Sequence, residues 1–307
     1  MNNNAACGRL EDNMRKEQFD ILVALEKDRL PHSAQELAAL TGHDASAVLD
    51  ELTAQGLVAD SAITEAGVAA LDHYKTKRAV FIAAGYGSRM RPITDTIPKP
   101  LVKVNGVRII DTLIDGVMAA GVEEIYVVCG YLGEQFAVLK EKYPNIHLVD
   151  NPLYTTCNNI SSVLMTREHL RNAYVLEADL FIYNKGIFDK YLYHSSYLGI
   201  PTEATDDWYF KVDENGVLYE LGIGSTDCCR MLGISYWSEE DGATLEEHVK
   251  ATFDMPGGKD EDWCYVPLVA FKDAYRVHVR ECAAEDIEEI DTFAELCAID
   301  PSYKNFC

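Results

Sequence analysis

The chain has 307 residues, of which 48% are hydrophobic and 25% charged, so it can bury a large core and form two domains. Its formal net charge of -23 argues against a general role in binding nucleic acid or acidic membranes, because phosphate groups are bound by clustered lysine and arginine. No run of about 18 apolar residues predicts a membrane span, and residues 1–17 contain no apolar stretch typical of a secretory signal. The 9 cysteines lack the CxxC spacing of metal sites, so we expect reduced thiols and a cytoplasmic location without membrane contact.

The first part of the chain predicts a small helical domain. Apolar residues at helical spacing indicate short helices near residues 19–25, 37–41 and 48–55, the last two ending at Gly42 and Gly56. Two short strands at residues 57–58 and 63–64 and a helix over residues 65–74 are expected to follow. This order resembles a winged-helix domain, which we assign to residues 1–78, with residues 75–78 as the link to the second domain.

Residues 79–307 have a different pattern, which is typical of an α/β domain. Short apolar strands at residues 79–84, 125–129, 147–149 and 174–178 alternate with helices near residues 109–120, 132–142 and 159–170. Such alternation predicts a parallel sheet covered by helices. After Asp179 the pattern becomes irregular, and strands at residues 208–212, 217–221 and 231–236 are expected to form a mixed-sheet lobe over the substrate end.

A glycine-rich loop after the first of these strands concentrates positive charge in an otherwise acidic chain. Its basic residues, against a single acid, are Arg89, Arg91, Lys99 and Lys103. Gly85 and Gly87 allow backbone N–H groups to approach a polyphosphate closely, and Arg89 and Lys99 can neutralise its charge. The spacing matches neither a P-loop nor a dinucleotide fingerprint. A structural turn would also use glycine, but the fixed offsets of the prolines, arginines and lysines favour a nucleotide-binding loop.

Residues 83–101 resemble the signature of a known enzyme superfamily. Their pattern, AAGxGSRxxPxTxxxPKPL, is similar to that of the sugar-1-phosphate nucleotidyltransferases. Later segments resemble the bacterial CTP:phosphocholine cytidylyltransferase branch, at residues 130–136, 158–162, 177–179, 233–237 and 289–291. The likeness extends from residue 79 to the C-terminus and leaves the first domain outside it.

The resemblance implies an α/β, Rossmann-like nucleotidyltransferase fold with a mixed, mainly parallel sheet. It also implies a cytidylyltransferase that transfers CMP from CTP to phosphocholine, giving CDP-choline and pyrophosphate. The implied nucleotide contacts are Ala83, Ala84, Gly85, Tyr86, Gly87, Ser88, Arg89, Asn158 and Asn159. Helix capping is the alternative role of the two asparagines.

Two aspartates are candidate ligands for Mg2+. This ion binds few carboxylates and completes its coordination shell with water and phosphate oxygens. Asp179 directly follows a strand, at the edge where α/β folds bind ligands, although a turn residue would occur there too. By resemblance, Asp291 is the second ligand, with a solvated acidic face as the alternative for its segment.

Two cations are the candidate catalytic residues. In the implied reaction a phosphate oxygen attacks the α-phosphorus of the triphosphate and pyrophosphate leaves, so positioning and charge neutralisation carry the rate. We expect Lys99 to bridge the acceptor phosphate and the α-phosphate, and Arg89 to hold the departing pyrophosphate.

All three tryptophans, Trp208, Trp237 and Trp263, lie in the later part of the chain. A quaternary ammonium has no N–H to donate and is bound by aromatic faces. These tryptophans and Tyr236 are therefore candidate contacts for phosphocholine, with ordinary core packing as the alternative for some of them. Asp262 and neighbouring acids would instead suit a primary amine, as in phosphoethanolamine or 2-aminoethylphosphonate. A sugar phosphate is the third acceptor class and is disfavoured, because a hydroxyl-rich ring does not need three tryptophans.

The winged-helix resemblance raises a competing hypothesis, a DNA-binding regulator that senses a metabolite. Residues 31–74 contain no lysine or arginine and would repel DNA with seven acids: Glu36, Asp44, Asp50, Glu51, Asp60, Glu65 and Asp72. We therefore expect no nucleic-acid partner and interpret the domain as a packing, regulatory or dimerisation module, the last giving a homodimer. An inactive nucleotide-binding protein is a further alternative, disfavoured because Arg89, Lys99, Asp179 and Asp291 occur together.

Overall fold

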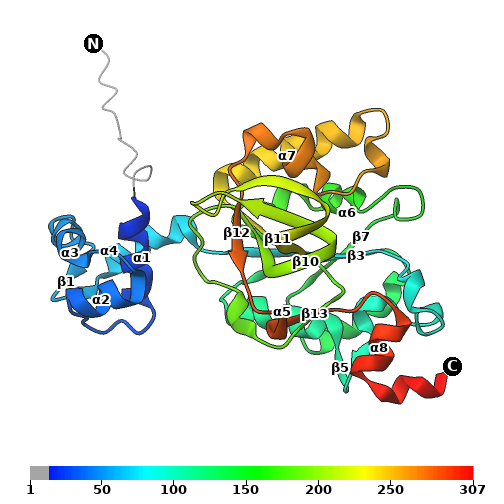
Figure 1. The fold of residues 1–307 in the computed structure, drawn as a ribbon. Helices are drawn as coiled ribbons and strands as arrows, with labels where there is room; N and C mark the ends of the chain where they lie inside the picture. Colours follow the sequence, from blue (N-terminus) through cyan, green and yellow to red (C-terminus); the bar gives the residue numbers. More distant parts are fainter. Residues whose placement is uncertain (1–13, 307) are drawn as a thin grey trace, which may run out of the picture. The chain divides into compact units, whose positions relative to one another are not determined.

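The computed structural model describes residues 14–306 and divides the chain into two compact units (Figure 1). The first unit ends at Lys75 and the second begins at Thr76. Residues 1–13 of the first predicted domain lie outside the described residues. Within the described part of the chain, no helix has both the length and the apolar composition that crossing a membrane requires.

The first unit contains three helices, a two-stranded ribbon and a fourth helix, in the predicted order. These are α1 (Lys16–Glu26), α2 (Ala34–Thr41), α3 (Ala45–Ala54), β1 (Val58–Ala59), β2 (Ala62–Ile63) and α4 (Glu65–Leu71). One apolar face of each helix is buried and supplies the core, which includes Phe19, Leu22, Leu37, Leu52 and Leu71. The seven acids between Pro31 and Tyr74 are all exposed. The likeness to a winged helix stays a prediction.

The second unit is built around a seven-stranded sheet with the strand order β12-β10-β11-β8-β3-β6-β7. The strands are β3 (Arg78–Ala83), β6 (Glu124–Cys129), β7 (His147–Asp150), β8 (Ala173–Glu177), β10 (Ser196–Val212), β11 (Leu218–Trp237) and β12 (His278–Glu281). From β8 to β7 all neighbours are parallel, whereas β11 is antiparallel to both β8 and β10. The predicted α/β fold with a mixed, mainly parallel sheet is confirmed.

Alternate residues of the central strand β3 enter separate cores on the two faces of the sheet, as the period of two in a strand requires. Phe81 packs with the apolar face of α5 (Ile109–Ala119) on one side. Val80 packs on the other side with α6 (Ile160–Met165) and α7 (Glu239–Asp254). Figure 1 shows α5 on one side of the sheet and α6 and α7 on the other. Because helices cover both faces of the sheet around β3, the ends of these central strands are left open for binding.

Some predicted elements differ from the observed ones in length or type. The short strands predicted at residues 208–212, 217–221 and 231–236 are parts of the two long strands β10 and β11. Register shifts near residues 197–199 and 205–208 let these strands bend without ending, which a sequence pattern does not predict. The helix predicted at residues 132–142 is a 3-10 helix (Gly133–Glu141), and the one at 159–170 is shortened to α6 and a 3-10 turn.

A small third layer lies near the C-terminus. Strand β13 (Ile287–Glu289) pairs with β9 (Leu180–Ile182), the strand that follows β8. Helix α8 (Phe293–Ile299) comes next and contributes Leu296 to a core with Met90 and Ile93 of the glycine-rich loop region. The end of the chain therefore packs against the loop that sequence analysis identified as the candidate nucleotide site.

Candidate active site

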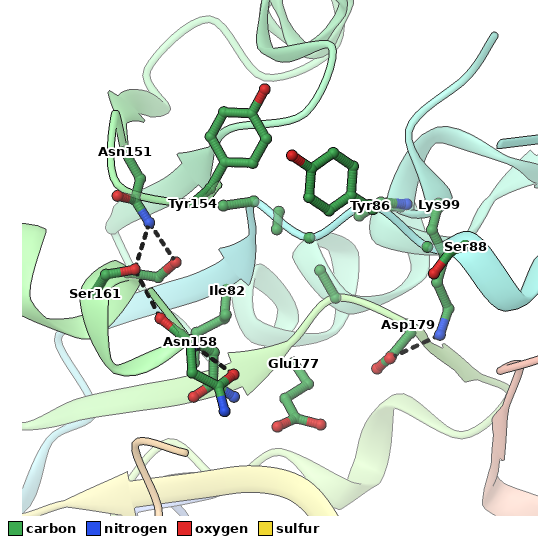
Figure 2. Close-up of a pocket in the computed structure, with 18 of the residues that line it drawn as sticks. Ile82, Tyr86, Ser88, Lys99, Asn151, Tyr154, Asn158, Ser161, Glu177 and Asp179 are labelled. Atoms are coloured by element: carbon green, nitrogen blue, oxygen red, sulfur yellow. Dashed lines mark hydrogen bonds and ion pairs between the residues drawn. The ribbon is translucent and has the colours of Figure 1, made fainter. Parts of the chain in front are cut away.

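A cavity of about 450 Å³ lies at the carboxyl ends of β3 and β8. Figure 2 shows its walls, with Tyr86 and Tyr154 on one side, Asn151 and Asn158 on another and the carboxylates of Glu177 and Asp179 below. The cavity is also lined by the remaining predicted nucleotide contacts, Ala83, Ala84, Gly85, Gly87, Ser88, Arg89 and Asn159. Lys99 and both predicted metal ligands, Asp179 and Asp291, line it as well.

The shape of the glycine-rich loop depends on Gly87. This residue has φ 59, and a Cβ added there would lie 2.8 Å from Cβ of Lys99 and 3.2 Å from Cγ2 of Thr94. The carbonyl oxygen of Gly87 accepts a hydrogen bond of 2.8 Å from the Thr94 hydroxyl. Glycine is therefore required by both the backbone conformation and the close approach. At Gly85 an added Cβ would meet nothing within 4 Å, which leaves the backbone accessible from the cavity.

Lys99 is buried and links the loop to two carboxylates from distant parts of the chain. Its ammonium donates to Oδ2 of Asp179 and to Oδ1 of Asp291, both at 2.8 Å. Arg89 donates to the same Oδ1 of Asp291 at 2.9 Å. Burial opposes the charge on Lys99, but the two aspartates outweigh it and raise the pKa of the ammonium above its usual value. Lys99 therefore carries a positive charge in this structure.

Three carboxylates converge next to this ammonium. Oxygens of Asp179, Glu289 and Asp291 lie within 4.8 Å of one another. Pairing of Glu289 with Leu180 across β13 and β9, and a 3.1 Å hydrogen bond from the Ile290 amide to the Asp179 carbonyl, bring them together. Burial, and then repulsion from nearby carboxylates, raise the pKa of Glu289 to about 7. Sequence analysis did not select Glu289, although side chains two apart on a strand point to the same side.

These carboxylates fit the requirements of a Mg2+ site. Oδ1 of Asp179 is buried and accepts no hydrogen bond from the described residues, so it has free capacity to bind a cation. Clustered oxygens are the donors that Mg2+ prefers. The predicted ligands Asp179 and Asp291 are thus brought together, with Glu289 as a third candidate.

A second acidic group borders the cavity. Glu177 ends β8 and packs against Gly233, where an added Cβ would lie 2.6 Å from Oε2 of Glu177. Burial, followed by repulsion from Asp179, Asp262 and Glu289, raises the pKa of Glu177 well above its usual value. A group in such surroundings is stabilised in its charged form by a cationic ligand. Sequence analysis quoted Glu177 as part of a motif without giving it a role.

Asn158 and Asn159 line the cavity, and hydrogen bonds to the segment from Asp260 to Trp263 hold their side chains in place. Asn159 precedes α6 but forms no side-chain cap bond to it. Instead its amide donates to Oδ2 of Asp262 at 2.6 Å, and its carbonyl accepts the backbone N–H of Trp263 at 2.8 Å. Asn158 donates to the backbone carbonyl of Asp260 at 3.1 Å. The alternative that Asn159 is a side-chain cap is therefore wrong.

A buried polar network supports the same wall; sequence analysis quoted its serines as part of a motif without a role and missed Asn151. The amide of Asn151 donates to the hydroxyls of Ser161 and Ser162 at 3.0 and 3.1 Å, and Ser161 donates to the carbonyl of Asn158 at 2.8 Å (Figure 2). Asn151 follows β7 and the serines belong to α6, so only folding brings them together. Their signal in the sequence is weak, because single polar residues after a strand are common.

Three of the predicted aromatic acceptor contacts are core residues, and their predicted role is corrected. Tyr236 and Trp237 are 0% exposed and pair with the first residues of β8, at the end remote from the cavity. The hydroxyl of Tyr236 donates to Asn172 at 2.9 Å. Trp263 is 3% exposed and stacks with Tyr197. Their large apolar area explains this burial.

Trp208 differs from these because 44% of it is exposed. It lies on β10 after Asp207, whose charge contributes to the raised pKa of Glu289. The next residue, Tyr209, pairs with Arg230, and Arg230 lies 3.4 Å from Glu289. Asp207 and Arg230 of the bent strands β10 and β11 are thus close to Glu289, whereas Asp262 is held by Asn159.

Comparisons with known proteins agree with this geometry. The family described as nucleotidyl transferase matches residues 78–187, which contain the glycine-rich loop, Lys99 and Asp179. A 2-aminoethylphosphonate cytidylyltransferase of Lancefieldella rimae is 37% identical over 235 residues, 73% of this chain and 92% of that protein. A choline-phosphate cytidylyltransferase of Streptococcus pneumoniae is 30% identical over 229 residues, 74% of this chain and 99% of that protein.

Solved structures extend the likeness to the fold. A structure of the CTP:phosphocholine cytidylyltransferase from Streptococcus pneumoniae matches with a TM-score of 0.68 and 29% identity. The match covers 74% of this chain and 99% of the other.

Proposed function

Because the chain belongs to the nucleotidyl transferase family and is a cytidylyltransferase, we propose that it transfers CMP from CTP to a phosphonate or phosphate that carries a primary amine, such as 2-aminoethylphosphonate. The observation that carries this choice is the acidic wall of the cavity. Glu177 and Asp179 border the cavity, whereas the rings of Tyr236, Trp237 and Trp263 are buried in the core. A primary ammonium has three N–H donors for such carboxylates, and a quaternary ammonium has none.

The proposed reaction forms one bond and breaks another at the α-phosphorus of CTP. An oxygen of the acceptor's phosphonate or phosphate attacks this atom, and the bond to the bridging oxygen of pyrophosphate breaks. The backbone N–H groups from Gly85 to Arg89 would hold the triphosphate. Lys99 would neutralise the two anions as they approach, and Arg89 the departing pyrophosphate.

Mg2+ is the proposed cofactor, held by Asp179, Asp291 and Glu289. The unpartnered Oδ1 of Asp179 and the convergence of three carboxylates support this assignment. The bound ion would supply additional positive charge for the triphosphate. Among the chain's own groups, Lys99 and Arg89 supply positive charge at Oδ1 of Asp291.

Phosphocholine is the second candidate acceptor. Among the predicted aromatic contacts, Trp208 on β10 is the one with an exposed ring, which a quaternary ammonium requires. The similarity to choline-phosphate cytidylyltransferases of Streptococcus pneumoniae and Haemophilus influenzae also supports it.

Pyrophosphate release from CTP and Mg2+ tests the proposal, with 2-aminoethylphosphonate, phosphoethanolamine, phosphocholine and a sugar 1-phosphate as separate acceptors. We expect kcat/KM for a primary amine to exceed that for phosphocholine by at least about 100-fold, because sites built to bind N–H groups reject analogues that lack them. Phosphocholine turnover at an equal or higher kcat/KM would overturn the choice of acceptor.

A matched pair of variants tests the acidic wall. Glu177→Gln is expected to raise KM for the primary amine about 10-fold or more, because it removes a charged hydrogen-bond acceptor, while KM for CTP stays close to wild type. Glu214→Gln is the control, since Glu214 is exposed in the turn between β10 and β11. Equal KM values for the amine in the two variants would remove Glu177 from the acceptor site.

A further inference from the structure

The side chain of Glu295 holds the backbone beside Asp291. One carboxylate oxygen, Oε2, accepts hydrogen bonds from the backbone N–H groups of both Asp291 and Thr292, each at 2.8 Å. The Thr292 hydroxyl accepts the backbone N–H of Glu295 at 3.2 Å in return, which completes a capping box at the start of α8. Bonds to an ionised acceptor are stronger than neutral ones. The first of these bonds reaches beyond the helix, to the residue before its N-cap.

Asp291 is the residue on which both catalytic cations converge. Its Oδ1 accepts from Lys99 at 2.8 Å and from Arg89 at 2.9 Å. Another of its contacts is with the carboxylate cluster, where oxygens of Asp179 and Glu289 lie within 4.8 Å. A rotation of the Asp291 backbone would therefore displace the partner of two cations and one member of the cluster.

Helix α8 packs against the glycine-rich loop region, and this packing fixes the position of the Glu295 backbone. Leu296 is fully buried in a cluster that contains Met90 and Ile93. Beyond the helix, Asp300 accepts the backbone N–H of Asn105 at 2.8 Å. The Glu295 carboxylate thus connects helix α8, which packs against the glycine-rich loop region, to the backbone of Asp291.

We propose that Glu295 is a positioning residue of the active site, which sets Asp291 for binding both the divalent cation and Lys99. The inference rests on the proposed function, in which Asp291 is a metal ligand. Groups that orient metal ligands typically change metal affinity by about 10- to 100-fold when they are removed. Glu295 itself touches neither substrate nor reacting atoms in this arrangement.

Binding of Mn2+ in the presence of CTP, followed by electron paramagnetic resonance, tests the inference without using activity. Glu295→Ala is expected to weaken Mn2+ binding about 10-fold. Glu295→Gln keeps an oxygen acceptor for both N–H groups and is expected to remain within about 3-fold of wild type. A Glu295→Ala affinity equal to wild type, or an equal loss in Glu295→Gln, would overturn the proposal.

Two further variants separate positioning from helix stability. Thr292→Val removes the hydroxyl that accepts from the Glu295 amide but leaves both bonds made by the Glu295 carboxylate. Thr292→Val is expected to lower Tm about as much as Glu295→Ala does. It is expected to weaken Mn2+ binding less than Glu295→Ala does. Glu36→Ala breaks the matching capping box of Ser33 in the first unit and should leave Mn2+ affinity unchanged. Equal losses of affinity in Thr292→Val and Glu295→Ala would overturn the proposal.

The outcome also separates this inference from the proposed function. Wild-type protein that binds no Mn2+ in the presence of CTP would contradict the proposed metal site itself. If wild-type protein binds Mn2+ and Glu295→Ala binds it equally tightly, the role of Glu295 is contradicted and the proposed metal site is not. Catalysis gives a second readout, because Glu295→Ala should require about 10-fold more Mg2+ for half-maximal turnover.

Discussion

The two ends of strand β8 carry opposite kinds of side chains. At the carboxyl end, Glu177 and Asp179 line the cavity, and Asp179 pairs with Lys99. At the amino end, Ala173 pairs with Trp237, whose indole is fully buried in the core. Both ends contain residues that sequence analysis assigned to ligand binding. Position along the strand, more than residue type, thus separates a residue that lines the cavity from a residue that packs in the core.

The largest expected effect is at the core end, where Trp237→Ala tests whether the indole only packs. Removing a fully buried tryptophan leaves a large cavity, so the variant should lose about 3–5 kcal/mol of unfolding free energy, measured by urea denaturation. KM for the acceptor, measured on the folded protein, should stay at the wild-type value. Unchanged stability with a raised acceptor KM would return Trp237 to the binding site.

At the cavity end the expected loss is in turnover and not in stability. Asp179→Asn should lower kcat by about 100- to 1000-fold, because it removes one carboxylate charge from the proposed Mg2+ site. The thermal midpoint should change little, since Lys99 keeps Asp291 as a partner. Pyrophosphate release at saturating CTP measures the first quantity, and near-normal turnover would remove Asp179 from the proposed mechanism.

A variant of Lys99 tests whether its ammonium neutralises Asp179 and Asp291 when no nucleotide is bound. Its ammonium lies between Asp179 and Asp291, where a divalent cation would compete with it. Lys99→Met should therefore bind Mn2+ about 10-fold more tightly in the absence of CTP, equivalent to about 1.4 kcal/mol. Lys103→Met, at an exposed lysine, is the matched control. Equal affinities of the two variants would show that Lys99 and the cation do not compete.

The smallest expected effect concerns Trp208, the one exposed tryptophan among the described residues. Trp208→Ala should raise KM for the acceptor by about 3- to 5-fold, in line with the modest energy of an exposed cation–π contact. KM for CTP should not change. A parallel rise in KM for the acceptor and for CTP would indicate that Trp208 stabilises the strand pair β10–β11 and does not contact the acceptor.

Prediction from sequence succeeded where the interactions are local. The α/β pattern of strands and helices follows from residue periodicity, and the glycine-rich loop places Gly87 and Lys99 at fixed offsets on one short segment. Prediction failed for the aromatic residues because an adjacent pair such as Tyr236 and Trp237 is equally typical of a binding site and of a core. Burial separates the two, and burial depends on the pairing of β11 with β8.

The sequence by itself determined the fold class and located the glycine-rich loop from Gly85 to Arg89 that lines the cavity, since both depend on patterns within a few residues. Only the tertiary structure decided which acids meet. Asp179 joins Glu289 and Asp291 through the pairing of β9 with β13, and Glu295 reaches Asp291 because α8 begins there. Contacts between residues so far apart in the chain depend on strand register and helix packing, which no local pattern specifies.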